Sequence, residues 1–111
     1  MTKLKLRINT KKEITKEFSR LKSFGFEVIT FNDNRPLRSQ QKNFVDHLLF
    51  NHKFVVFVEV KLGTDKLNEN QERVMNKLSA ASVFNKNMDY KLIHDLQSTK
   101  RLVDNLLQGK I

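Results

Sequence analysis

The segment at residues 54–61, FVVFVEVK, constrains the fold of this 111-residue chain more than any other stretch. It is a nearly continuous run of β-branched and aromatic residues followed closely by Gly63, which is typical of a strand covered on both faces. Alternate residues of a strand share a face, so Glu59 and Lys61 are expected to project from the same side. Charged groups beside such an apolar run need to be paired, solvated or bound to a metal ion. The segment therefore predicts a central strand with a charged pair at its end.

The charge of the chain favours a polyanionic partner. Lysine and arginine total 21 against 12 acidic residues, a formal net charge of +9, which indicates nucleic acid more strongly than a membrane surface. No stretch approaches the length of a membrane-spanning helix, and the N-terminus shows no secretory hydrophobic core. The absence of cysteine excludes a disulfide framework and a thiolate zinc site. We expect a soluble, intracellular and cytoplasmic protein that does not enter a membrane.

The remaining patterns predict one α/β (α+β) domain over residues 1–111, with the order α-β-β-β-α-β-α around a mixed four-stranded sheet. The second and third strands read as an antiparallel hairpin, and a crossover helix makes the following strand parallel to the third. Alternating basic and apolar residues over 1–9 suggest a further short strand or an arm. The expected helices are 11–24, a segment starting at Asn68, and a segment around Leu102 to Leu107; the expected strands are 26–31, 43–50, 54–61 and 90–94.

Several basic side chains are candidate nucleic-acid contacts. One set recurs at four-residue intervals on the side of the first helix opposite its apolar residues. Another lies in residues 32–42, which contain the only proline and no periodicity and are therefore expected to form an exposed loop. Each side chain either meets phosphates or is simply solvated. The candidates are Lys12, Lys16 and Arg20 in the helix, Arg35 and Arg38 in the loop, and Lys66 in the loop after the 54–61 run.

Asp46 lies on the strand before the 54–61 run and comes near Glu59 across the hairpin if the registers agree. With Lys61 this makes an aspartate followed by Glu-x-Lys, and the chain here resembles the PD-(D/E)XK nuclease superfamily, whose core has the same element order. FVEVKLGTDKLNENQERVMNKL is similar to the virus-type replication and repair nucleases (VRR-NUC), whose following helix carries a glutamine in its first turn, here Gln71. KLIHDLQSTKRLVDNLL resembles their closing strand and helix, and Holliday-junction resolvases of the superfamily are similar as well.

One position departs from the family pattern: the residue before the aspartate, commonly proline, is Val45 here. Asp33 is the alternative acid, although it lies in the predicted loop.

The resemblance implies a site that uses Mg²⁺ or Mn²⁺, with Asp46, Glu59 and the backbone carbonyl of Val60 as oxygen ligands. A divalent ion both neutralises charge on phosphorus and makes a nucleophile from water. Lys61 would position or help deprotonate that water and stabilise the negative transition state. Gln71 would orient water or phosphate from the start of its helix, where the dipole is positive.

Two of the implied residues have an equally good structural explanation. Glu13 resembles the glutamate that some family members use for a second metal ion, but it also follows Thr10 at the spacing of a capping box. Gln71 follows Asn68 at the same spacing, so it either serves the site or caps the helix. The sequence leaves both alternatives open.

The resemblance implies a divalent-metal-dependent endonuclease that hydrolyses DNA, on branched or structured DNA such as Holliday junctions, and that acts as a homodimer. A first alternative is a non-catalytic nucleic-acid-binding protein with the same fold. In that case Glu59 and Lys61 form a solvated ion pair worth less than about 1 kcal/mol, and Asp46 is a surface strand residue. A second alternative is a sequence-specific homing or restriction-type endonuclease.

Overall fold

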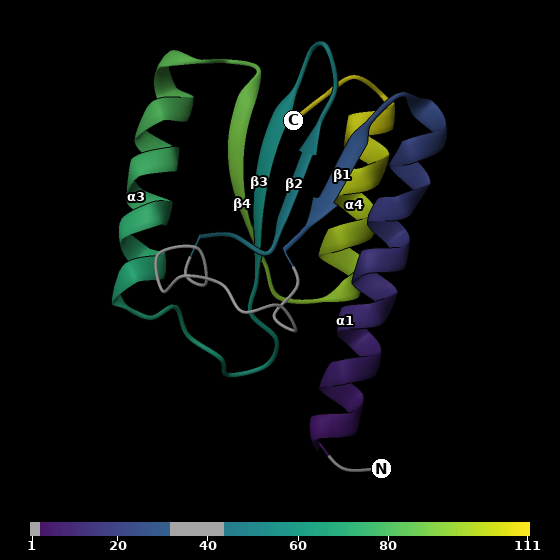
Figure 1. Cartoon of the computed structure of the whole chain (residues 1–111), viewed down its shortest axis with the longest axis vertical. Helices are drawn as coiled ribbons and strands as arrows, with labels where there is room; N and C mark the ends of the chain where they lie inside the picture. Colours follow the sequence, from purple (N-terminus) through teal and green to yellow (C-terminus); the bar gives the residue numbers. More distant parts are fainter. Residues whose placement is uncertain (1–2, 32–43) are drawn as a thin grey trace.

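The structure is a computed structural model that describes residues 3–31 and 44–111 (Figure 1). The described part is an α+β domain with one mixed sheet in the strand order β1-β2-β3-β4. β1 pairs antiparallel with β2, β2 antiparallel with β3, and β3 parallel with β4, so the predicted element order and strand directions are confirmed. The elements are α1 (Lys3–Ser19), the 3-10 helix η1 (Arg20–Phe24), β1 (Glu27–Thr30), β2 (His47–Phe50), β3 (Val55–Val60), α3 (Glu69–Phe84), β4 (Met88–Ile93) and α4 (Leu96–Leu107).

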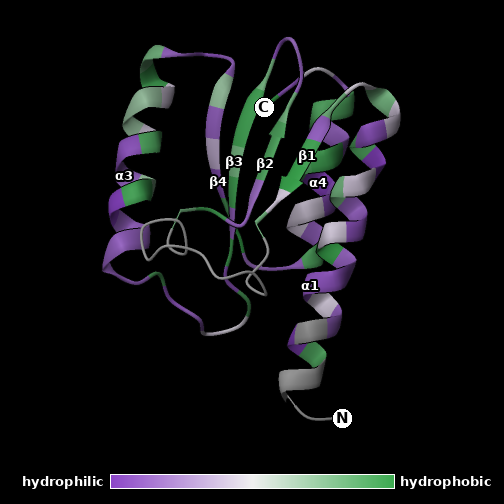
Figure 2. Cartoon of the chain, viewed as in Figure 1, coloured by the Kyte–Doolittle hydropathy of each residue, from purple (hydrophilic) through white to green (hydrophobic). Residues whose placement is uncertain are grey.

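The core lies between one face of the sheet and the helices α1 and α4. Val56 and Val58 of β3 are fully buried there against Phe18 of α1 and Val103 of α4, because alternate residues of a strand point to the same face. Figure 2 shows the hydrophobic residues concentrated on the central strands and on α4. This layer provides most of the apolar burial and therefore supports the strand that carries Glu59.

The other face of the sheet is only partly covered, by α3, which packs beside β4. None of the α3 residues is fully buried. The residues on its inner side, at the helical spacing predicted from the sequence, are half-buried, and the rest of the helix is exposed. The half-buried positions are Gln71, Val74, Met75, Leu78, Ala81 and Ser82.

The short strand predicted over residues 1–9 is wrong for residues 3–9, because α1 already begins at Lys3. The capping box of Thr10 and Glu13 is also wrong, since both residues lie inside this helix. The Thr10 hydroxyl instead donates to the carbonyl of Leu6 at 2.9 Å. A short alternation of basic and apolar residues is compatible with the two-residue period of a strand and with the 3.6-residue period of a helix. Because the turns around Ile14 are already helical and buried, extending the helix toward the N-terminus costs little per residue.

The hairpin between β2 and β3 sets the register that matters for the site. The side-chain oxygen of Asn51 accepts hydrogen bonds from the amides of Lys53 and Phe54, at 2.8 and 2.7 Å, which is a typical asparagine turn. His47 consequently lies opposite Val58. The antiparallel pairing was predicted, but the turn geometry decides which residues face each other.

The strand boundaries differ from the predicted ones by a few residues. β2 begins at His47 and not at residue 43, and β4 begins at Met88, so Asp89 belongs to the strand and not to the preceding turn. The predicted loop at 32–42, with Asp33, Arg35 and Arg38, lies outside the described residues. In the part of the chain that the structure describes, no helix is both long and apolar enough to span a membrane.

Candidate active site at the end of strand β3

Asp46 and Glu59 lie side by side at the end of the sheet. Asp46 was predicted on the second strand but lies just before β2, which begins at His47. His47 pairs with Val58, so Asp46 lies next to Glu59 on the sheet face that α3 partly covers. The amide of Asp46 donates to the carbonyl of Val58 at 3.0 Å, and the amide of Val60 donates to Oδ2 of Asp46 at 2.8 Å. This charge-assisted bond holds the Asp46 carboxylate against the end of β3.

Glu59 is almost completely buried, with 3% of its surface exposed. Burial raises the pKa of Glu59 to about 8, and the charge of Asp46 and a hydrogen bond between the two carboxyl groups act in the same direction. The positive charges of Lys61 and Lys11 oppose this shift of the pKa. At neutral pH Glu59 therefore holds a proton, and a bound cation can take the place of that proton.

Gln71 caps α3, one of the two alternatives that the sequence left open, and its side chain also contacts Glu59. Its backbone amide donates to Oδ1 of Asn68 at 2.9 Å, and its Oε1 accepts from the Asn68 amide at 3.0 Å, which completes the capping box of α3. Its Nε2 donates to Oε1 of Glu59 at 3.4 Å. The start of α3 is thereby attached to the acidic pair, and the positive end of the helix dipole lies beside it.

Lys61 follows the end of β3 on the same face as Glu59. Its amide donates to the carbonyl of Ile93 at 2.9 Å, and its carbonyl accepts from Nδ1 of His94 at 3.0 Å. The backbone of Lys61 is thus held on both sides where β3 and β4 end. Its positive charge lowers the pKa of Glu59, as expected for an ammonium group close to the carboxyl pair.

Tyr90 is a further neighbour of the acidic pair that the sequence analysis missed. It pairs with Phe57 of β3 and therefore lies on the same sheet face as Glu59. Burial raises the pKa of Tyr90 further above its usual value, together with the negative charges of Glu59 and Asp46. Side chains alternate between the two faces of the sheet along β3 and β4, so the register of these strands would have identified Tyr90 as a neighbour of the site.

His47 is a packing residue beneath the acidic pair, on the opposite face of β2. Its ring lies edge-on to Phe18, with 4.9 Å between the ring centroids, and its Nδ1 is hydrogen-bonded to the Thr30 hydroxyl at 3.0 Å. Burial lowers the pKa of His47 to about 4, an effect that the charge of Asp46 opposes and that of Lys11 reinforces. His47 is therefore neutral at physiological pH.

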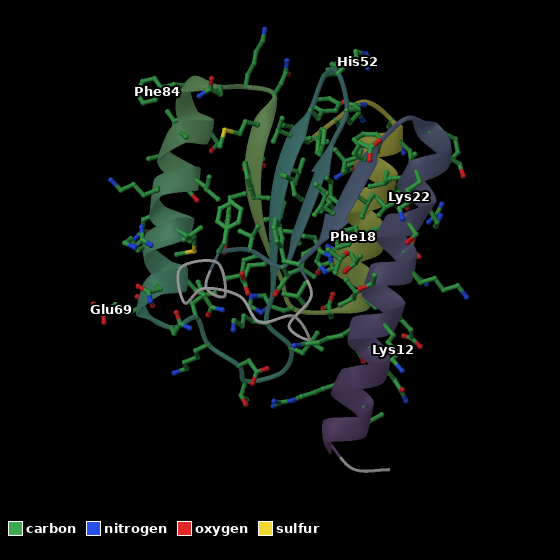
Figure 3. All side chains as sticks on the ribbon, in the orientation of Figure 1. Lys12, Phe18, Lys22, His52, Glu69 and Phe84 are labelled. Atoms are coloured by element: carbon green, nitrogen blue, oxygen red, sulfur yellow. The ribbon has the colours of Figure 1, made fainter. Side chains whose placement is uncertain are left out.

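In the part of the chain that the structure describes, the remaining predicted residues form no hydrogen bond or ion pair with the acidic pair. Glu13 is exposed on α1, and the α1 residue whose charge acts on Glu59 is Lys11. Lys12 and Lys16 are exposed on the side of α1 opposite Ile14, as Figure 3 shows for Lys12.

Two further basic candidates are described by the structure. Arg20 forms ion pairs with Glu17 and, at 4.0 Å, with Asp104 of α4. Lys66 is exposed in the loop after β3. A hollow of about 530 Å³ lies at the hairpin end of the sheet, lined by Lys53, Phe84 and neighbouring residues, and so does not belong to this site.

Two side chains with metal-binding oxygens meet at the site, Asp46 and Glu59. Within residues 3–31 and 44–111, no group of three or more histidine, cysteine, aspartate or glutamate side chains is placed to hold a metal ion. A metal ion at the pair would complete its shell with the Val60 carbonyl, water or substrate oxygens. Comparison of the chain with protein-family models, with curated proteins and with solved structures finds no match in any of the three.

Proposed function

We propose that this protein is a divalent-metal-dependent endonuclease that hydrolyses DNA phosphodiester bonds, with Asp46 and Glu59 as its metal ligands. The observation that carries the proposal is the pair of adjacent carboxyl groups, one of them buried with a pKa raised to about 8. Buried neighbouring carboxyl groups are costly to ionise, and such perturbed groups are enriched at functional sites. A divalent cation relieves this cost and suits hard oxygen ligands.

The surrounding groups suit phosphodiester hydrolysis. Mg²⁺ or Mn²⁺ bound at the pair would supply charge neutralisation and a water of lowered pKa. Lys61 then places an ammonium group where negative charge develops on the phosphate. Gln71 has its amide nitrogen 3.4 Å from Glu59, so it can orient the carboxylate and a water beside it. The formal charge of +9 supports a polyanionic substrate.

The order of elements supports the same proposal at the level of fold. A helix, three strands, a helix, a strand and a helix occur in the order of the PD-(D/E)XK core, with the two acids on β3 and just before β2. We further propose branched or structured DNA, such as Holliday junctions, as the substrate and a homodimer as the active form. Two symmetric sites would cut two strands.

The proposal is tested on linear, flap and four-way DNA with Mg²⁺, Mn²⁺ or EDTA. The wild-type protein should cut in the presence of metal and not in EDTA, and Glu59→Gln and Lys61→Met should each lower the rate at least about 100-fold. Glu72→Gln and Lys77→Met, exposed on α3, carry the same charge changes and should cut normally. Cutting by the Glu59 and Lys61 variants at the control rate would refute the catalytic assignment.

A non-catalytic nucleic-acid-binding protein is the second candidate. One observation favours it: the Asp46 carboxylate already accepts a hydrogen bond from Val60, as a purely structural residue would. Binding that persists in EDTA, without product after Mg²⁺ or Mn²⁺ is added, would support this function. Discrete fragments from linear duplex DNA would instead indicate a sequence-specific homing or restriction-type endonuclease.

A further inference from the structure

α1 extends beyond the core at the end of the molecule that carries the acidic pair. Figure 1 shows its N-terminal turns and the segment after β3 at this same end, away from the β2–β3 hairpin. Ile14, Phe18 and Leu21 are fully buried on the inner side of α1 and η1. Continuing their spacing of three and four residues toward the N-terminus leads to Lys11 and Arg7. The inner side of the helix thus changes from apolar to cationic where the core ends.

Arg7 connects this part of α1 to the segment after β3. Its Nη1 lies 3.0 Å from Oδ1 of Asp65, and both side chains are partly exposed. Asp65 is four residues after Lys61, so the ion pair holds the N-terminal turns of α1 beside the site. A partly exposed pair of this kind is worth little in stability, and an arriving phosphate can compete with Asp65 for Arg7.

Lys11 is exposed one turn farther along the same side of α1. Its ammonium has no ion-pair partner among the residues described by the structure. Its charge nevertheless acts on groups of two neighbouring strands, since it lowers the pKa of both Glu59 and His47. These effects agree with the helical spacing: Lys11 lies near the end of the sheet and not on the outer side of α1.

We propose that Lys11, together with Arg7, forms a phosphate subsite beside the acidic pair. This inference rests on the proposed function, in which a second phosphate of the same nucleic-acid strand binds next to the one being hydrolysed. The subsite binds a phosphate through a cation and contains no reacting atom, so Lys11 is a binding residue. It also differs from the exposed stripe of Lys12 and Lys16, which lies on the opposite side of the helix.

Binding without metal tests the subsite separately from catalysis. The probe is a fluorescein-labelled single-stranded DNA oligonucleotide in EDTA, measured by fluorescence anisotropy at several salt concentrations. Lys11→Met should weaken binding about tenfold, as expected for a lost charge-assisted contact, and lower the slope of log K against log salt by about 0.7. Lys22→Met removes the same charge from an exposed position of η1 and should change the affinity less than about twofold.

Lys11→Arg keeps the cation and should retain most of the affinity, which separates loss of charge from loss of fold. Far-UV circular dichroism confirms that each variant is folded. Equal affinities of Lys11→Met and Lys22→Met, or no binding of the oligonucleotide by the wild-type protein, would overturn the subsite. If no DNA is cut with Mg²⁺ or Mn²⁺ while Lys11→Met alone loses binding in EDTA, the nuclease proposal fails and the subsite stands.

Discussion

Gln71 Nε2 donates a hydrogen bond to Oε1 of Glu59 over 3.4 Å, while the other end of the same amide completes the cap of α3. The Gln71 side chain therefore makes two separate contacts, one to the cap of its own helix and one to Glu59. A capping box accepts either glutamate or glutamine, but only glutamine adds a donor for Glu59. The start of α3 and the acidic pair are consequently coupled through one side chain.

Replacing Gln71 by glutamate separates the two functions. Gln71→Glu keeps the capping oxygen but places a third carboxyl group beside Asp46 and Glu59, so it should lose little stability at pH 5 and more at pH 8. Gln71→Ala removes the side-chain part of the cap and should lose about 1 kcal/mol at both pH values. Urea denaturation at pH 5 and pH 8 measures the free energy of unfolding that each variant loses. An equal loss for Gln71→Glu at both pH values would show that its contact with Glu59 has no energetic effect.

Glu59→Gln should stabilise the fold at alkaline pH. The pKa of Glu59 is raised from 4.5 to about 8 in the folded protein, so the folded state holds the proton more tightly than the unfolded state. The contribution of the protonated Glu59 carboxyl group to the free energy of unfolding is complete below pH 4.5 and is lost as the pH rises toward 8. Between pH 6.5 and 8, the wild-type protein should lose about 2 kcal/mol relative to Glu59→Gln. The free energy of unfolding of both proteins, with Glu72→Gln as control, is measured by urea denaturation. A constant difference over this range would contradict the raised pKa.

Metal binding should be linked to proton release from Glu59. A metal ligand must be deprotonated, so below pH 8 the affinity for Mn²⁺ should fall by up to about tenfold per pH unit. The rise in melting temperature produced by Mn²⁺ should accordingly be larger at pH 8.5 than at pH 6.5. Glu59→Gln should abolish most of the rise, and Glu72→Gln should leave it unchanged. If the increase in melting temperature depends neither on pH nor on Glu59, the metal ion binds at a site other than the acidic pair.

His47 should make the protein sensitive to acid. Its pKa is lowered from 6.5 to about 4 in the folded protein, so the unfolded state takes up the proton first as the pH falls. The contribution of neutral His47 to the free energy of unfolding is complete above pH 6.5. It decreases as the pH falls toward 4, by about 3 kcal/mol at most. The difference in stability between the wild-type protein and His47→Leu should change by this amount over the window, in favour of the variant at low pH. A difference that stays the same from pH 7 to pH 4 would argue against a buried neutral histidine.

Freeing Arg7 from its partner should strengthen phosphate binding. Asp65→Asn removes the carboxylate that lies 3.0 Å from Arg7 and should increase the affinity for the oligonucleotide in EDTA about threefold. Asp104→Asn is the matched control, because it makes the same change in net charge beside Arg20 of η1. If both variants gain equally, the effect is one of net charge and Arg7 has no local role.

Local patterns were sufficient for the element order and for the inner face of α3. The 54–61 run forms β3, and Gln71, Met75, Leu78 and Ser82 lie on the half-buried side of the following helix. Both predictions depend on the two-residue and 3.6-residue periods, which short-range geometry imposes. The start of α1 was mispredicted because Leu4, Leu6 and Ile8 satisfy a strand period over a few residues, whereas the longer helical stripe includes Arg7 and Lys11.

The sequence by itself determined that a carboxyl and an ammonium group follow an apolar strand on one face, since that follows from alternation alone. Only the tertiary structure decided which groups surround them. The hairpin register places Asp46 beside Glu59, the packing of α3 brings Gln71 to the same carboxyl group, and β4 adds Tyr90. These contacts join residues far apart in the chain. Their distances depend on register, helix length and packing, which no local period specifies.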